Sequence, residues 1–336
     1  MVFKRLLGSL GVGGPTVDTV LTTGAAAPGG PLSGQVRLKG GSAGFDIDHI
    51  ALELVARVED ERGDEEAEGV VAFERFTVGG GFRLGEGEQL SVPFTVTLPW
   101  ETPITELYGQ SLGIVLGVRT EVSVAGAKDK GDLDRLAVGP LPVQEAILEA
   151  FGQLGFGFGS ADLEYGRIGG TGQQLPFYQE IELTPSPQYA HTVNEIEVTF
   201  LATAGGMEVV LEADRRGGPL SGGHDALTRF TVAHDGIHHQ DWQALVDGWL
   251  RQLAEHRSAY AEGSAYGHGD PYAGHLAHHE DHHHDGGHRS GPGLGTAVAV
   301  GAAGLAVGVV GGMVAAEVVD EVGDFFEDDE DEDGDD

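Results

Sequence analysis

The amino-acid sequence predicts an all-β protein made of two antiparallel β-sandwich lobes with short helices, followed by a low-complexity tail. Short stretches alternate apolar and polar residues with a period of two, which places one face of a strand in a core. Turns rich in glycine separate these stretches without long helices between them, as in sandwich proteins. The 56 glycines among 336 residues also fit a chain of many turns.

The composition limits the classes of partner and of chemistry. Hydrophobic residues make up 40% of the chain, which is enough for a core, and the formal net charge is −35. A surface so acidic repels phosphate backbones, so we expect no nucleic-acid partner. The chain has no cysteine, which excludes disulfides and thiol chemistry and fits a cytosolic protein. After Lys4 and Arg5 the apolar run is short and broken by glycines, unlike a secretion signal.

Residues 1–139 are predicted to form the first lobe. A short amphipathic helix at 3–10 opens it, either as a lid on the sandwich or as a weak membrane contact. The clearest strand runs through 92–98, where apolar residues alternate with small polar ones. Pro93 indicates an edge strand because proline gives the ladder no N–H, and Pro99 and Pro103 end the strand at a corner between sheets.

The remaining strands of this lobe follow the same pattern. Residues 50–58 and 116–124 alternate in polarity, and a further strand is predicted around 71–76. The charged run 59–68 contains Gly63 and predicts a hairpin loop or a disordered insert. The glycine-rich stretch 79–88 is predicted to be a flexible connection.

Residues 140–240 are predicted to form the second lobe. Pro140 and Pro142 mark its boundary, and apolar residues at helical spacing through 143–154 predict a helix that ends at Gly155. Strands are then predicted at 177–183, 193–201, 207–213 and 227–232.

An amphipathic helix is predicted at 241–257, with Trp242 and Trp249 on its apolar stripe. Tryptophans in such a stripe pack in a core or between lobes more often than they bind a partner. If the stripe is exposed, Trp242 and Trp249 become the candidate contact for a partner protein.

The tail begins with residues 258–295, which are rich in Gly, His, Asp and Tyr and are predicted to be a disordered linker. Neutral imidazoles near carboxylates suit Zn²⁺ or Ni²⁺, so this tract is a candidate metal site. The candidate ligands are His278, His279, His282, His283, His284 and His288. Because the tract has no fixed geometry, weak adventitious binding is favoured over a functional site, and no cofactor is expected. A pH-dependent spacer is a third interpretation.

Residues 296–316 are uncharged and apolar, and 21 residues of helix are long enough to span a bilayer core of about 30 Å. Gly304, Gly308 and Gly312 are spaced by four, so two helices could approach closely there. The many glycines weaken both helix propensity and membrane insertion. Membrane contact, a soluble oligomerisation segment and a disordered tail therefore all stay open. Residues 317–336 form an acidic tail without the spacing of a calcium loop.

Catalysis finds no support in the sequence. It has no phosphate loop with its lysine. Carboxylate pairs occur throughout so acidic a chain and single out no site. We therefore expect a protein that is not an enzyme.

Several segments resemble, in the same order, those of the bacterial sporulation-control (SpoOM-type) family. They are LPWETPIT at 98–105, GVGGPTVDTVL at 11–21, PGGPLSGQVRLKGG at 28–41, AGAKDKGDLDRLAVGPLP at 125–142, LPFYQEIELTP at 175–185 and EVVLEADRR at 208–216. The resemblance implies an arrestin-like fold of two β-sandwich lobes. It also implies a regulatory or adaptor protein of sporulation or cell differentiation, with partners in sporulation or cell-division control.

The tail departs from what the family core requires, so it leaves the location of the protein open. We expect a cytoplasmic protein, either free or held at the inner face of the cell membrane by 296–316. The alternative function is a metal-binding or metal-sensing protein that displays its His tract on a β-sandwich scaffold.

Overall fold

The computed structural model describes residues 14–22, 24–60, 67–191, 193–213 and 227–265. Its described residues up to Arg257 belong to one compact unit. Strands dominate this unit and helices are few, so the predicted all-β class is confirmed. The predicted N-terminal helix, the centre of the charged run 59–68 and the tail beyond Ala265 lie outside the described residues.

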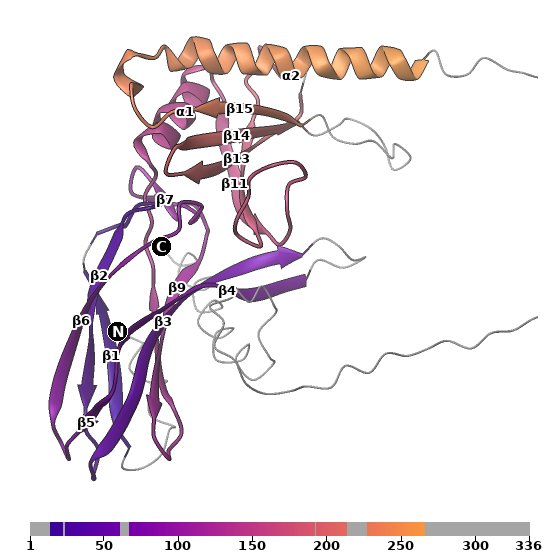
Figure 1. The fold of residues 1–336 in the computed structure, drawn as a ribbon. Coiled ribbons are helices and arrows are strands. Elements are labelled where there is room, and N and C mark those ends of the chain that lie inside the picture. The colour runs from indigo at the N-terminus through magenta and orange to yellow at the C-terminus, as the bar shows by residue number, and fades with distance from the viewer. Residues whose placement is uncertain (1–13, 23, 61–66, 192, 214–226, 266–336) are drawn as a thin grey trace, which may run out of the picture. The chain divides into compact units, whose positions relative to one another are not determined.

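Two layers of strands make up the first part of the chain (Figure 1). One layer has the order β1-β2-β6, and the other contains β10-β9-β3 with β4 and β5 also paired to β3. The strands of the two layers together are β1 (Thr16–Leu21), β2 (Pro31–Lys39), β3 (Phe45–Asp60), β4 (Ala67–Gly79), β5 (Phe82–Leu84), β6 (Gln89–Thr97), β9 (Leu116–Val124) and β10 (Lys130–Arg135). A short hairpin of β7 (Glu106–Leu107) and β8 (Gln110–Ser111) follows β6.

The strand that contains Pro93 lies at an edge, as the sequence predicts. Among the described strands β6 pairs with β2 alone, and Pro93 stands opposite Gln35 in this ladder. Val36 and Phe94 face the layer of β3 and β9, where Ile50, Leu52 and Val118 are buried. The apolar side chains that alternate with polar ones along these strands therefore fill the space between the layers.

The second part of the chain holds an antiparallel series of strands that two helices accompany. The series is β11 (Gly157–Glu164), β12 (Tyr178–Thr184), β13 (Ile196–Thr203), β14 (Gly206–Ala213) and β15 (Thr228–Val232). The helices are α1 (Pro142–Gln153) and α2 (Trp242–Ala265), with a 3₁₀ turn, η2 (Ile237–His239), before the latter. The predicted helix end at Gly155 is confirmed, since Gly155 has φ +85° directly after the C-cap residue Leu154.

One sheet runs through both parts of the chain. The order β10-β9-β3-β11-β12-β13-β14-β15 includes strands of each predicted lobe. The link is a parallel pair between Glu59 at the end of β3 and Glu164 at the end of β11. The N–H of Tyr165 also donates to the carbonyl of Glu59, at 2.7 Å. β3 makes this contact because its 16 residues extend beyond β9.

Some elements differ from the prediction. The expected flexible connection 79–88 contains β5, which pairs with β3 and buries Leu84. β10 and β11 are not predicted, because β10 is polar and lies at a sheet edge, while β11 begins with small residues that show no alternation. α2 continues past Arg257 to Ala265, where the sequence contains no proline to stop it. The boundary between residues 139 and 140 stays a prediction.

Candidate functional site at the junction of the lobes

The segment that follows β6 contacts the second predicted lobe. Glu101 lies in this segment, and its carboxylate accepts hydrogen bonds from two consecutive N–H groups of the second lobe. Gln174 N donates to both carboxylate oxygens, at 2.9 and 2.7 Å, and Leu175 N donates at 2.9 Å. Burial raises the pKa of the Glu101 carboxyl, while these backbone donors act in the opposite direction. The carboxylate thus fixes the loop that leads into β12.

Gln179 of β12 contacts the same segment. Its side-chain oxygen accepts from Ile104 N at 3.0 Å, and its side-chain nitrogen donates to Ile104 O at 2.8 Å. Ile104 itself is fully buried. A single amide side chain therefore satisfies both main-chain groups of a buried residue, as an adjacent strand would do.

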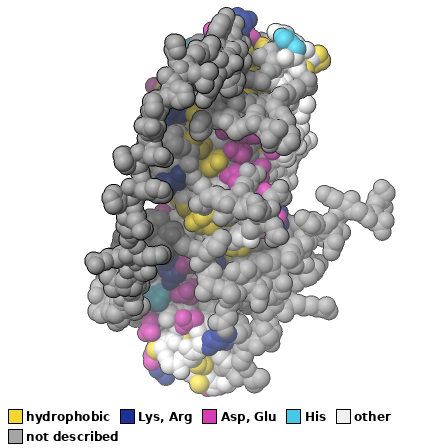
Figure 2. Space-filling view, turned by 90° about the vertical axis from the view of Figure 1, so that its right-hand side faces the viewer, with side chains coloured by type: hydrophobic (Ala, Val, Ile, Leu, Met, Phe, Trp, Pro, Cys, Tyr) yellow, Lys and Arg dark blue, Asp and Glu magenta, His cyan; other side chains and the backbone are white. Residues whose placement is uncertain are grey.

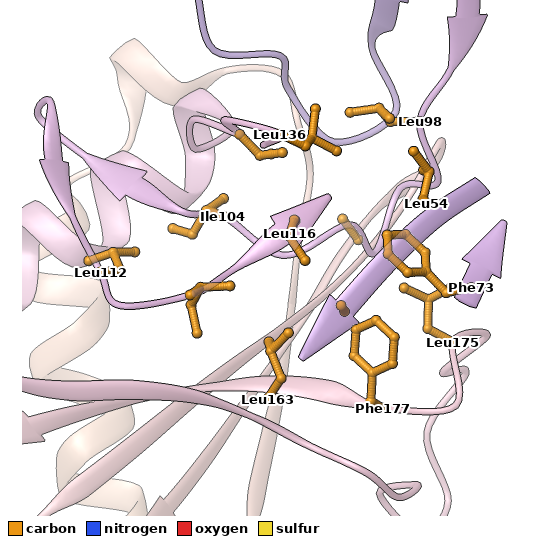
Figure 3. Close-up of a cluster of buried hydrophobic side chains, with 14 of the residues drawn as sticks. Leu54, Phe73, Leu98, Ile104, Leu112, Leu116, Leu136, Leu163, Leu175 and Phe177 are labelled. Atoms are coloured by element: carbon orange, nitrogen blue, oxygen red, sulfur yellow. The ribbon is translucent and has the colours of Figure 1, made fainter. Parts of the chain in front are cut away.

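Two aromatic contacts also join residues of the two predicted lobes. Trp100 stacks on His234, which follows β15, with ring centroids 5.2 Å apart and planes inclined by 25°. Phe73 of β4 meets Phe177 edge to face, with ring centroids 5.4 Å apart. Figure 3 shows Phe73 beside Phe177 and Leu175, and all three belong to the buried cluster that continues through both lobes.

The close approach of Trp100 depends on a glycine. Gly29 has φ +67°, and a Cβ built on it would lie 2.4 Å from the Trp100 ring. A side chain at this position would therefore be strained and would also collide with the indole.

Together these contacts make the junction a packed and hydrogen-bonded interface, which couples the positions of the two lobes. This arrangement is suited to presenting a fixed surface.

A second feature is a face of half-buried carboxylates on β11 to β14. Asp162 stands opposite Glu180 in the ladder, and Glu197 stands opposite Glu212. Two triads have ligand atoms within 4.8 Å of one another, namely Asp162, Glu164 and Glu180, and Glu180, Glu197 and Glu212. Carboxylate oxygens are the ligands that Ca²⁺ and Mg²⁺ take, so these residues have the spacing to hold such an ion. Figure 2 shows acidic side chains gathered beside hydrophobic ones on the face it draws.

The electrostatics of this face favour the protonated acids. Burial raises the pKa of Glu180 to about 9, and the carboxylates of Glu197, Asp162, Glu212 and Glu164 add to the effect. Burial, followed by Glu212 and further carboxylates, raises the pKa of Glu197 to about 7. The sequence did not predict this face, because carboxylate pairs are too frequent in the chain to mark it.

Trp242 and Trp249, the two tryptophans of the predicted apolar stripe, are both at least partly buried. Trp249 is 6% exposed and stacks on Phe230 of β15 with ring centroids 4.7 Å apart. Trp242 is partly buried, and its indole N–H donates to Ile237 O at 2.9 Å. The stripe therefore packs on the second lobe, which is the interpretation the sequence favoured. A partner contact through this stripe requires exposed tryptophans, and Trp249 is buried.

The other predicted site residues lie outside the described residues. They are His278, His279, His282, His283, His284 and His288 of the candidate metal tract, and Gly304, Gly308 and Gly312 of the apolar segment. Within the described ranges, no helix is both long enough and apolar enough to cross a membrane. The sequence carries no signal that marks Glu101 or Gln179, although it predicts a corner between sheets at Pro99 and Pro103.

Comparison with known proteins yields three agreeing matches. The model of the SpoOM protein family matches residues 3–217. The sporulation-control protein spo0M of Bacillus subtilis (strain 168) is 38% identical over 221 residues, which are 66% of this chain and 83% of the relative. The crystal structure of Spo0M, sporulation control protein, from Bacillus subtilis matches with a TM-score of 0.64 and 32% identity, covering 72% of this chain and 100% of that one. This likeness agrees with the predicted arrestin-like β-sandwich fold.

Proposed function

The chain belongs to the SpoOM protein family, and we propose on that basis that it is a regulatory protein of sporulation control that acts through other proteins rather than by catalysis. The observation that carries the proposal is the match to the family over residues 3–217, together with 38% identity to a relative named for sporulation control. The relative's name gives the biological process, and the mode of action is our inference.

The junction supports an adaptor rather than a pair of independent modules. Glu101 and Gln179 connect the lobes by hydrogen bonds, and Phe73 and Phe177 connect them by buried aromatic packing. A partner that contacts both lobes therefore meets surfaces held in one relative position, which lowers the entropy cost of binding. The partners in this proposal are proteins of sporulation or cell-division control.

The tail extends the proposal beyond the family core. In this view residues 1–139 and 140–240 are the two lobes, 241–257 form the helix that packs on the second lobe, and 258–295 are a linker. Residues 296–316 then act as either a membrane tether or an oligomerisation segment in a cytoplasmic protein, and 317–336 are a solvated acidic end. Two forms of the protein, complete and lacking 296–336, distinguish these roles by carbonate-washed membrane fractionation and by size-exclusion chromatography.

A genetic experiment tests the regulatory role. The complete chain is expressed in a Bacillus subtilis strain that lacks its own spo0M gene, and spore counts are compared with those of the parent strain and of the empty strain. We expect at least partial restoration of the parent's sporulation frequency. A chain that accumulates as a folded protein and leaves the spore count at the empty-strain value would contradict the proposal.

The second candidate function is metal binding by the His tract, which its imidazole density favours. It is tested by titrating Ni²⁺ and Zn²⁺ into the complete protein and into a form without 278–288. Stoichiometric, sub-micromolar binding that disappears with the tract and shifts the oligomeric state would support this function. Weak, non-saturating binding would rule it out.

A further inference from the structure

An apolar pocket opens where the β7–β8 hairpin faces α1, β11 and β12. Its volume is about 140 Å³, and its lining includes Leu107, Leu112, Leu148, Gly152, Phe158 and Leu183. A cavity of about 150 Å³ is known to accept benzene, so this pocket has room for one phenylalanine or leucine side chain. Both predicted lobes contribute to the lining, so the junction described above also sets the shape of the pocket.

One exposed aromatic side chain lines this pocket, and a second follows a lining residue in the chain. Phe158, which lines it, is 50% exposed, and Tyr108, next to the lining residue Leu107, is 62% exposed. Tyr108 and Gly109 form the two-residue turn of the hairpin with φ 53° and 75°. Asparagine or glycine adopts the left-handed conformation at lower cost than tyrosine. An exposed aromatic held in a strained turn beside an apolar pocket is a feature of binding sites more than of stability.

The charges around the pocket have one sign. Glu145 and Glu149 precede the lining residues Leu148 and Gly152 by three positions on α1, so they lie along the same side of the helix. Segments 106–112, 142–160 and 178–184, which form the pocket, contain no Lys or Arg. Burial raises the pKa of the Tyr108 hydroxyl, and the carboxylates of Glu145 and Glu149 add to this rise. The tip of the hairpin is therefore close enough to these carboxylates to interact with them.

We propose that this pocket is the docking site for a basic segment of a partner protein. One leucine or phenylalanine of the segment enters the pocket, and neighbouring Lys or Arg side chains pair with Glu145 and Glu149. The apolar anchor supplies most of the binding free energy, while the carboxylates give orientation and a faster encounter. The inference rests on the proposed regulatory function, because it names the chemistry of the partner that such a function requires.

Peptide binding to the complete chain tests the proposal. The probes are fluorescent octapeptides with a central Leu between Lys residues, and matched peptides with a central Ser or with Glu in place of Lys. We expect the Lys–Leu peptide to bind at least tenfold more tightly than either matched peptide, by fluorescence anisotropy. Its affinity is expected to fall with salt, and to fall about three- to tenfold in the double variant Glu145→Gln/Glu149→Gln.

A substitution at Gly152 blocks the pocket without disturbing the core. A Cβ at this position meets nothing within 4 Å, and replacing a helical glycine favours the helix. Gly152→Leu fills the pocket and is expected to weaken binding of the Lys–Leu peptide at least tenfold. Gly248→Leu on α2 is the matched control, because a Cβ there also meets nothing within 4 Å and Gly248 is outside the lining, and it is expected to change the affinity less than twofold. Urea unfolding of both variants verifies that they fold as the unaltered chain does.

Three results would overturn the proposal. The first is equal affinity of Gly152→Leu and the unaltered chain for the Lys–Leu peptide. The second is no preference of the unaltered chain for that peptide over its matched controls. The third is self-association of the complete chain that Gly152→Leu abolishes, which would make a second copy the occupant. The spore counts described above are a separate readout. A chain that fails to restore sporulation removes the proposed function, whereas the peptide affinities are judged on their own.

Discussion

The side chain of Gln179 binds both main-chain groups of Ile104, accepting from its N–H at 3.0 Å and donating to its carbonyl at 2.8 Å. One residue thus replaces an adjacent strand where the chain passes from the first sandwich toward the second. Ile104 is fully buried, so without Gln179 these two groups would lose their partners away from water. The stability of the junction should therefore depend on this one amide.

Gln179→Leu is expected to lower the free energy of unfolding by about 2–3 kcal/mol, because two buried backbone groups lose their hydrogen bonds. Urea unfolding followed by circular dichroism measures the change. Gln252→Leu on α2 is the control, since Gln252 is exposed and its replacement should change stability by less than about 0.5 kcal/mol. Equal stability of the two variants would show that Gln179 does not hold the junction.

Gly29→Ala tests the packing of Trp100. The left-handed backbone at Gly29 costs alanine about 1 kcal/mol, and the added Cβ would lie 2.4 Å from the indole ring. We expect a total loss of about 2–4 kcal/mol. Gly87→Ala is the matched control, because Gly87 has φ +61° and nothing lies within 4 Å of its Cβ. It should show the conformational cost alone, so a similar loss in both variants would argue against a collision with Trp100.

The strands of this protein could be predicted from the sequence wherever alternation was regular. The strands around 50–58, 92–98, 116–124 and 207–213 lie close to the observed β3, β6, β9 and β14. The edge position of β6 followed from the missing N–H of Pro93. β10 and β11 escaped prediction because neither shows this alternation.

The candidate sites were harder to predict, because they depend on contacts between residues distant in the sequence. Glu101 and Gln179 each look like ordinary polar residues until the fold brings them to the junction. The parallel pair of Glu59 and Glu164 joins strands about a hundred positions apart, and local patterns carry no information on it. Apolar periodicity did identify Trp249 as a packing residue, since burial of a helix stripe is a local property.

Glu53→Gln tests a charge network on the outer side of the first lobe. Glu53 is 9% exposed and pairs with Arg75 and with Arg119, whose Nε donates at 2.8 Å. Burial alone would raise the pKa of Glu53, but the hydrogen bonds and charges of the two arginines outweigh burial and lower it. We expect the variant to lose about 2–3 kcal/mol near neutral pH, because Arg119 loses the carboxylate of Glu53 and Arg75 is left with that of Glu121.

Asp46→Asn is the matched control for this network, since Asp46 pairs with Arg83 at 3.1 Å where both side chains are exposed. That pair should contribute less than about 1 kcal/mol. A group with a lowered folded pKa stabilises above its ordinary pKa and loses this contribution as the pH falls through the folded value. The stability gap between the unaltered chain and Glu53→Gln should therefore close below about pH 4.5 in urea unfolding. A gap that persists unchanged in acid would contradict the ionic origin.

Glu180→Gln is expected to stabilise the protein at alkaline pH. The pKa of Glu180 is about 9 in the folded protein, against an ordinary value of 4.5. Between these two pH values, the folded protein therefore keeps a proton on Glu180 that the unfolded chain has released. Stability therefore decreases as the pH rises through this window, and the loss is complete above the folded pKa. Glutamine does not titrate, so the variant lacks this decrease and should be more stable by about 1–2 kcal/mol at pH 8.

Urea unfolding of Glu180→Gln and of the unaltered chain at several pH values checks this expectation. The advantage of the variant should grow steadily from about pH 5 to about pH 9. Glu86→Gln removes an exposed carboxylate and serves as the control for the change in net charge. If Glu86→Gln gives the same pH-dependent gain, net charge explains the effect. If only Glu180→Gln does, the cause is the local repulsion that Glu180 meets from Glu197 and its other carboxylate neighbours.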